Sequence, residues 1–253
     1  VAGGNHAAVY VERAVIDWFK QLLGFPESAM GLLVSGGSMA GVIALAVARN
    51  KACEKAGWSV RENGVEDVPR RLVVYKGAEG HACHQKAIEL LGLGSSNLRI
   101  IPSDTSLRII PDALEEMILE DIAAGSIPVA VVASAGTVNA GAIDPLAELA
   151  DVCNRNDVWL HVDGAYGAPA ILTNEYRSAL SEISRADSVA IDPHKWMYAP
   201  VEAGMVLIKD AVAMRDTFSL VPPYLRTDGN VHGVQGLPWF SEFGVQQTRG
   251  FKA

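Results

Sequence analysis

The sequence has little of three things that would place the protein in a specialised class. Only 3 of its 253 residues are cysteine (Cys53, Cys83 and Cys153), too few and too scattered for a disulfide framework, which favours reduced thiols and a cytoplasmic location. There is no block of Lys and Arg, and 21 basic against 29 acidic residues give a net charge of −8, so nucleic acid is not an expected partner. The longest apolar run, Met39–Ala48, is about half of the ~20 residues that a membrane-spanning helix needs, so no membrane association is expected.

What the sequence does have is an alternation of short β-rich runs and longer helical patterns. Seven runs rich in Val, Ile and Leu do not alternate with polar residues, as in strands buried on both faces: Gly31–Val34, Leu72–Tyr75, Leu98–Ile101, Val129–Ala133, Val158–Val162, Ser188–Ile191 and Met205–Ile208. Helical patterns cover Ala8–Leu23, Ser38–Lys55, Ala82–Leu91, Pro111–Ala124, Pro145–Asn154 and Glu175–Ser184. The alternation predicts an α/β fold with a mostly parallel sheet covered by helices on both sides.

Two local details refine the helix predictions. In the first helix, a stripe that includes Val15, Trp18 and Phe19 is expected to face the core. Asp144 is expected to cap the helix that begins at Pro145.

The end of the chain differs in character. Residues 222–243 combine Gly and Pro with single Asp, Asn and His residues and several aromatics, and they have no clear hydrophobic period, which is typical of a functional or mobile loop. Residues 244–253 resemble the start of a new regular element, and the first residue is Val. We therefore expect the chain to be a piece of a longer protein.

Ligands in open α/β sheets bind at the carboxyl ends of parallel strands. The first predicted strand runs into Ser35-Gly36-Gly37-Ser38 and then directly into an apolar helix. Glycines allow close approach of an anion, and a helix N-terminus offers unpaired N–H groups. The segment lacks Walker and GxGxxG spacing, so a phosphate cradle and a plain tight turn both remain open.

Two further strand ends carry charged residues. The fifth predicted strand leads into Asp163, whose burial requires a partner; an N-cap or structural ion pair is the alternative, and the nearby His161 reads as a packed core histidine. After the sixth predicted strand, Lys195 stands between His194 and Trp196. A lysine in an apolar site loses pKa and becomes a nucleophile for carbonyl groups, able to form a Schiff base.

The second predicted strand is followed by His81 and His84 with Cys83 between them. The two histidines could bind a metal, but no third ligand stands at zinc-like spacing, so we expect no metal. A stacking or proton-handling role for His81 is the preferred interpretation, and a histidine at a helix start is the alternative.

Together these groups predict one cofactor. Pyridoxal phosphate has a phosphate, a pyridine nitrogen, an aldehyde and a flat ring face, and each finds one matching group here. A hydrolase that uses Ser38 lacks recognisable triad partners, and a cofactor-free interaction protein leaves the coincidence of strand-end groups unexplained.

With these motifs in place, the sequence resembles the group II pyridoxal-phosphate decarboxylases, the family of aromatic-amino-acid, tyrosine, histidine and glutamate decarboxylases. The matching segments are Val34–Ala40, Tyr75–Ala87, Gly136-Thr137, His161–Gly167 and Ala186–Trp196, and they cover nearly the whole chain. The resemblance implies the large domain of fold-type I enzymes, with a seven-stranded, mainly parallel sheet. Residues 1–221 would form this cofactor-binding domain, 222–243 the active-site loop and 244–253 the start of the continuation toward an absent small domain.

The resemblance also implies roles for single residues. Lys195 would hold the cofactor as a Schiff base, Asp163 would pair with the pyridine nitrogen and His81 would stack on the ring. The phosphate end would involve Gly37, Ser38, Ser188, Asp192 and His194, and Thr137 and Ala165 would line the ring.

The implied activity is decarboxylation of an L-amino acid to an amine and CO2 by a homodimer. Relatives carry a tyrosine in the mobile loop, whereas here that stretch has Trp239 and Phe240 and only the preceding Tyr224. Oxidative deamination to an aldehyde, another fold-type I reaction such as an aminotransferase or lyase, and a catalytically incomplete fragment therefore stay open as alternatives.

Overall fold

The computed structural model describes residues 7–220 and the last residue, Ala253. The described chain forms one seven-stranded sheet. In spatial order the strands are β1 (Met30–Val34), β7 (Gly204–Ile208), β6 (Ser188–Ile191), β5 (Trp159–Asp163), β4 (Ile127–Ser134), β2 (Leu72–Gly77) and β3 (Leu98–Ile101). β7 runs antiparallel to both of its neighbours, and the remaining pairs are parallel. The predicted α/β class and all seven strands are confirmed.

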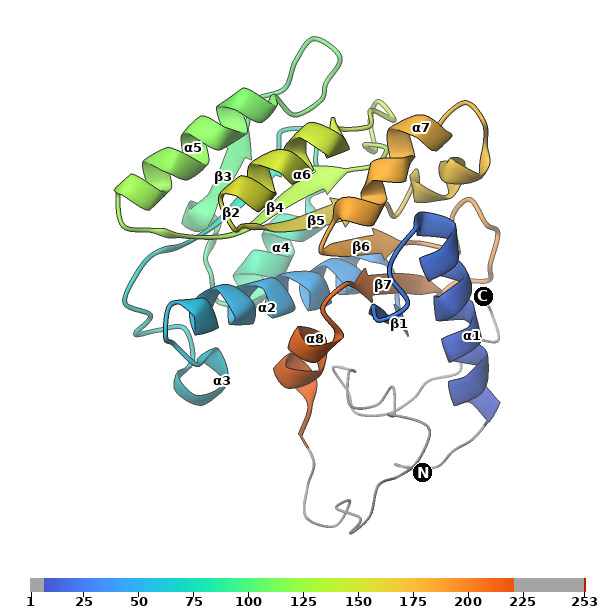
Figure 1. Ribbon diagram of the computed structural model, residues 1–253, viewed down its shortest axis with the longest axis horizontal. Helices are drawn as coiled ribbons and strands as arrows, with labels where there is room; N and C mark the ends of the chain where they lie inside the picture. Colours follow the sequence, from blue (N-terminus) through green and yellow to red (C-terminus); the bar gives the residue numbers. More distant parts are fainter. Residues whose placement is uncertain (1–6, 221–252) are drawn as a thin grey trace.

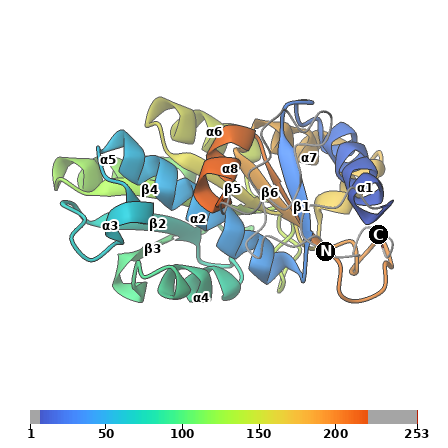
Figure 2. The ribbon, with the colours of Figure 1, turned by 90° about the horizontal axis from the view of Figure 1, so that it is seen from below.

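Helices cover both faces of this sheet (Figure 1). They are α1 (Ala7–Leu23), α2 (Gly37–Lys55), α3 (Val60–Asn63), α4 (Cys83–Leu90), α5 (Pro111–Ala123), α6 (Leu146–Arg155), α7 (Arg177–Leu180) and α8 (Ala211–Phe218). Figure 1 shows α5, α6 and α7 above the strands and α2 with α3 and α8 below them. Seen from below in Figure 2, α2 runs across its face of the sheet, where it contacts five of the strands. Within the described residues, no helix combines the length and apolar character that a membrane crossing requires.

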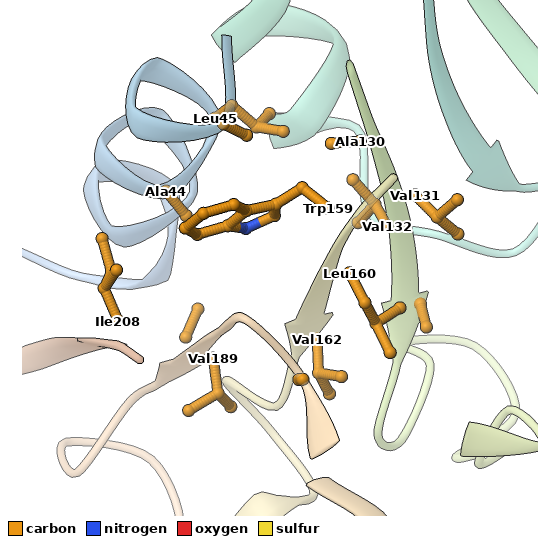
Figure 3. Packing of buried hydrophobic residues seen from close by; sticks show 14 of the residues in the cluster. Ala44, Leu45, Ala130, Val131, Val132, Trp159, Leu160, Val162, Val189 and Ile208 are labelled. Atoms are coloured by element: carbon orange, nitrogen blue, oxygen red, sulfur yellow. The ribbon is translucent and has the colours of Figure 1, made fainter. Parts of the chain in front are cut away.

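The core is built around α2 and the central strands. α2 is apolar on nearly all sides, and Ala40, Ala44 and Ala48 are fully buried, as expected for a helix enclosed by other elements. Figure 3 shows the Trp159 indole lying against Ala44 of α2. The indole N–H donates to the Ser188 hydroxyl at 2.8 Å, so the buried polar atom is satisfied.

Three local predictions are wrong. The predicted helix 175–184 is broken into α7 and a 3-10 turn (Ser181–Arg185), where the hydroxyls of Ser181 and Ser184 donate to carbonyls three residues earlier and favour the tighter turn. Trp18 is 65% exposed, and Ile16 and Leu23 are buried on the inner side of α1 instead.

Asp144 does not cap α6, because Pro145 occupies the cap position. The Asp144 carboxylate instead accepts the N–H groups of Ile109 at 2.8 Å and of Ser134 at 2.7 Å. It thereby ties the turn before α5 to the end of β4, a long-range role that local sequence cannot reveal.

β7 fixes the position of the glycine turn that follows β1. Gly204 opens β7 and pairs with Val34, the last residue of β1. A Cβ atom on Gly204 would lie 2.3 Å from the Cα of Gly36, closer than any side chain permits. The two backbones therefore touch directly, which holds the turn at the carboxyl edge of the sheet.

Candidate active site

A cavity of about 260 Å³ opens at the edge of the sheet where the parallel strands end. It collects residues from the ends of β1, β2, β4, β5 and β6, which lie far apart in the sequence. Nine of the ten predicted site residues line it: Gly37, Ser38, His81, Thr137, Asp163, Ala165, Asp192, His194 and Lys195. The sheet therefore brings the predicted lysine, carboxylate and glycine turn to one place.

Ser188 is the exception. It is the first residue of β6, four positions before Asp192, which lines the cavity, and it is fully buried. Its hydroxyl contacts the Nδ1 atom of His161 at 2.9 Å and accepts the Trp159 N–H at 2.8 Å. This geometry does not support a phosphate contact from Ser188, because the hydroxyl faces the interior of the protein.

The glycine turn forms an open cradle. Gly36 occupies the N-cap position of α2, and no side chain caps the helix there, so its first N–H groups remain available to an anion. A Cβ atom on Gly37 would lie 2.9 Å from the Cβ of Ala165 and 3.1 Å from Asp192 Oδ2. A larger residue would fill the space in front of these N–H groups.

Lys195 is held by a buried carboxylate. Its Nζ atom lies 2.9 Å from Asp192 Oδ2, and the His194 Nε2 atom lies 3.6 Å from the same oxygen. The Ala203 N–H donates to His194 Nδ1 at 2.9 Å, which orients this imidazole with its Nε2 side toward Asp192. Asp192 is buried, and its Oδ1 atom has no hydrogen-bond partner within the described chain, a polar atom left available beside the glycine turn.

His81 sits at the start of α4 and is exposed at the cavity. Its Nδ1 atom accepts the Cys83 N–H at 3.1 Å. In the neutral ring the proton is therefore on Nε2. This local bond holds the imidazole at the cavity wall, where a planar ligand could stack on it.

Asp163 has a partner that the sequence did not reveal. Its Oδ2 atom lies 2.8 Å from Nε2 of the fully buried His84, and its Oδ1 atom accepts the Ala165 N–H at 3.2 Å. Burial alone would raise the pKa of Asp163, but the hydrogen bond and charge of His84 outweigh it and hold that pKa well below its usual range. The carboxylate is therefore ionised.

His84 is charged for the reciprocal reason. Burial alone would lower the pKa of His84, but the hydrogen bond and charge of Asp163, together with the neighbouring Cys83, outweigh burial and raise it to about 10. The neighbouring His161 ring meets His84 edge-on, with centroids 5.6 Å apart. Burial and the charge of His84 lower the pKa of His161 to about 3, so His161 is neutral.

The two histidines of the Gly80–His84 segment lie in different surroundings, one exposed and the other buried. The ligand atoms of Cys83, His84 and Asp163 do lie within 4.8 Å of one another. The close approach of His84 and Asp163 is that of a charge-assisted hydrogen bond. His81 is not part of this group, so the arrangement lends no support to the alternative, already disfavoured by the sequence, in which His81 and His84 share one ion.

Eight residues that line the cavity were not among the predicted site residues: Ser35, Gly36, Met39, Cys83, Ser134, Gly136, Val138 and Tyr166. The Tyr166 ring meets the Trp196 ring edge-on at 5.0 Å, which is a favourable aromatic geometry. Tyr166 follows Asp163 by three residues in the predicted motif. This closeness in sequence was the one signal that could have indicated that Tyr166 lies in the site.

A family sequence model described as the pyridoxal-dependent decarboxylase conserved domain matches residues 5–253. The chain belongs to the pyridoxal-dependent decarboxylase family. Its fold, its cavity and its lysine agree with the predicted resemblance, and the cofactor of this family is pyridoxal phosphate.

Curated and solved relatives support the same family assignment. The decarboxylase domain is 42% identical over 253 residues to the aromatic-L-amino-acid decarboxylase of Bacillus atrophaeus, covering 100% of this chain and 49% of that protein. It is 36% identical over 200 residues to the human acidic amino acid decarboxylase GADL1, covering 79% of this chain and 37% of that one. The crystal structure of Oryza sativa TDC with PLP and tryptamine superposes with a TM-score of 0.88 at 30% identity, covering 97% of this chain and 51% of that one. The decarboxylase domain therefore spans about half the length of these relatives or less.

The residues present fit pyridoxal phosphate. Any Cβ atom at Gly37 would fill the cradle. Asp192 Oδ1 is a buried polar atom without a hydrogen-bond partner in residues 7–220. The cavity also combines the Lys195 amine, the ionised Asp163 carboxylate and the open N–H groups at the start of α2. These are the functional groups that an aldehyde, a pyridine nitrogen and a phosphate require.

The His84–Asp163 pair is expected to make the stability of the cofactor-free chain sensitive to alkaline pH. Because the pKa of His84 rises from an ordinary 6.5 to about 10 in the folded state, its stabilising contribution is complete below pH 6.5 and is lost as the pH rises toward 10. The contribution of Asp163, whose pKa is lowered, is present above its ordinary 3.8 and is lost only as the pH falls below that value.

We therefore expect the free energy of unfolding, measured with urea, to decrease between about pH 6 and about pH 9 more steeply in the native protein than in His84→Gln. Glutamine keeps a donor but does not titrate. Identical pH slopes for the two proteins would contradict this assignment of charge.

Proposed function

We propose that the protein decarboxylates an L-amino acid to the corresponding amine and CO2 with pyridoxal phosphate as its cofactor. The observation that carries the proposal is the convergence of Lys195, Asp163 and the Gly37 cradle on one cavity of about 260 Å³. This distribution matches a molecule with an aldehyde, a ring nitrogen and a phosphate at separate positions.

We assign the residues by the chemistry that each can supply. The N–H groups at Gly37 and Ser38 would bind the phosphate, and the Lys195 amine would take the aldehyde. Asp163 would face the ring nitrogen and His81 the ring surface, while Thr137 and Ala165 would line the sides. Asp192 and His194 would hold the lysine end of the pocket.

When bound, pyridoxal phosphate supplies an electron-accepting ring that stabilises the electron pair left behind when CO2 departs. The chain's own residues prepare that property. The ionised Asp163 carboxylate favours a proton on the ring nitrogen, because an adjacent negative charge stabilises the protonated form. Without that proton the ring would be a weaker electron acceptor.

Asp192 positions the amine of Lys195. The Asp192 carboxylate lies 2.9 Å from the Lys195 Nζ atom and is buried, so it is placed to accept a proton when the amine becomes a nucleophile. It also keeps Nζ near the glycine cradle. A phosphate bound at the start of α2 would therefore place the rest of the cofactor close to this amine.

We further propose that two copies form a homodimer. Large apolar side chains are exposed beside the cavity: Tyr198 is 91%, Val138 66% and Trp196 46% exposed. Such a group of exposed hydrophobic residues next to a site is typical of an interface.

All three cysteines lie in the described part of the chain and are free thiols, which supports a cytoplasmic location.

We also propose the predicted division into a cofactor-binding part, 1–221, and an active-site loop, 222–243. The loop, the continuation 244–253 and the residues Tyr224, Trp239 and Phe240 lie outside the described residues, so the proposal for them rests on the sequence alone.

Product analysis tests the proposed reaction. The cofactor-loaded protein is incubated with a panel of aromatic, acidic and imidazole-bearing L-amino acids, and amine, CO2, aldehyde and ammonia are quantified. We expect one amine and one CO2 per substrate consumed. Aldehyde with ammonia, or no product from any member of the panel, would overturn the proposed decarboxylation.

A further inference from the structure

The partner of Asp163 is a buried histidine that is placed by three separate elements. His84 lies in the first turn of α4, is 1% exposed, and its Nε2 atom lies 2.8 Å from Asp163 Oδ2 at the end of β5. Asp163 also lines the cavity, whereas His84 does not. His84 thus stands behind the carboxylate, outside the predicted cofactor contacts.

The third element, α2, leaves room for this ring. Gly41 lies inside α2, where glycine is less favourable than alanine. A Cβ atom at this position would lie 3.2 Å from both Cε1 and Nδ1 of His84, a tighter contact than side chains normally make. The unfavourable glycine is explained by the space that the imidazole occupies.

A further layer restricts the ring from the side. The neutral His161 meets His84 edge-on at an interplanar angle of 68°. His161 is itself fixed by the Ser188 hydroxyl at 2.9 Å, which also accepts the Trp159 N–H. The bond from His84 Nε2 to Asp163 is the hydrogen bond that orients the ring, and the neighbouring Cys83 side chain contributes with Asp163 to raising the pKa of His84.

We propose that His84 is a positioning residue for the cofactor, one that acts through Asp163 by holding its carboxylate ionised and turned toward the pyridine nitrogen. This inference rests on the proposed function, because Asp163 must face that nitrogen for the positioning to matter. A carboxylate at 14% side-chain exposure receives little stabilisation from water. The imidazolium supplies it instead, at the Oδ2 atom of Asp163.

The test is a titration of the protein with pyridoxal phosphate labelled with 15N at the ring nitrogen. The 15N chemical shift reports whether that nitrogen is protonated, and fluorescence gives the dissociation constant. In His84→Leu, which removes the donor and the charge, we expect a shift toward the unprotonated value and an affinity lower by roughly 10-fold to 100-fold. His84→Gln, which keeps a donor without the charge, is expected to lie between the two and is the variant to use if leucine prevents folding.

Two controls separate positioning from general structural damage. Lys86→Gln, an exposed change on the same helix, is expected to leave the shift and the affinity unchanged. Binding of inorganic phosphate to the cofactor-free protein is expected to be the same in the native protein and in His84→Gln, because the cradle at α2 is not altered.

A double-mutant cycle decides whether His84 acts through Asp163. If it does, His84→Gln changes the 15N shift in the native protein but not in Asp163→Asn, so the two effects are not additive. Additive effects, or a protonated ring nitrogen in both His84→Leu and His84→Gln, would overturn the positioning role. Failure of the native protein to bind the labelled cofactor would instead overturn the proposed function itself.

Discussion

Lys195→Ala is expected to abolish covalent attachment of the cofactor and to reduce amine production by at least about 10²–10⁴-fold, the range associated with losing one group that transfers protons in a reaction. The reason is that Lys195 is the lysine that lines the cavity, 2.9 Å from a buried carboxylate. The fold should persist, because the Lys195 side chain is 42% exposed and Asp192 keeps His194 nearby.

Borohydride reduction followed by intact-mass measurement checks this prediction. The native protein should gain the mass of one pyridoxyl group, and Lys195→Ala should gain none. Lys55→Ala, which removes an exposed lysine paired with Asp157, serves as the control and should label as the native protein does. Equal labelling of Lys195→Ala would show that another amine holds the cofactor.

The second large effect is expected for Asp163→Asn. It should lower kcat by roughly 10²–10³-fold, as when one preorganised electrostatic group is removed from an active site, while Lys195 still attaches the cofactor. The substitution also leaves the buried His84 without its anionic partner, and breaking a buried charge pair costs about 3–5 kcal/mol. Turnover and stability should therefore fall together.

Asp187→Asn is the matched control. Asp187 is a partly buried carboxylate just before β6, and its Oδ2 atom accepts the Leu160 N–H at 2.8 Å, but it does not line the cavity. We expect this variant to lose stability in urea and to keep its kcat. A kcat for Asp163→Asn within a few-fold of the native value would contradict the assigned role of the carboxylate.

Much of the fold was predictable because buried parallel strands carry a strong local signal. Runs such as Val129–Ala133 are too apolar and too β-branched to be anything but interior strands, and the alternation with helices implies parallel connections. Lys195 and Asp163 were predictable for a related reason, since a charge directly after such a run must lie at the sheet edge where ligands bind.

The contacts that cross between elements were not predictable from local pattern. A metal site shared by His81 and His84 was considered because the two are close in sequence, but it was not expected, and the local pattern indicated no other role for His84. The helix start places one in solvent and the other against Asp163, 79 residues further along the chain. Asp144 and Ser188 were misplaced in the same way, since their partners lie in other strands and turns.

The sequence by itself determined the class of fold, the family and the groups that lie at the ends of the strands, because hydrophobic pattern and short motifs are properties of neighbouring residues. Only the tertiary structure decided that β7 runs antiparallel and presses Gly204 against Gly36, and that His84 stands behind Asp163. Backbone approaches and buried charge pairs depend on which distant segments share a surface. These contacts form only when the chain has folded and has removed the backbone and charged groups from water.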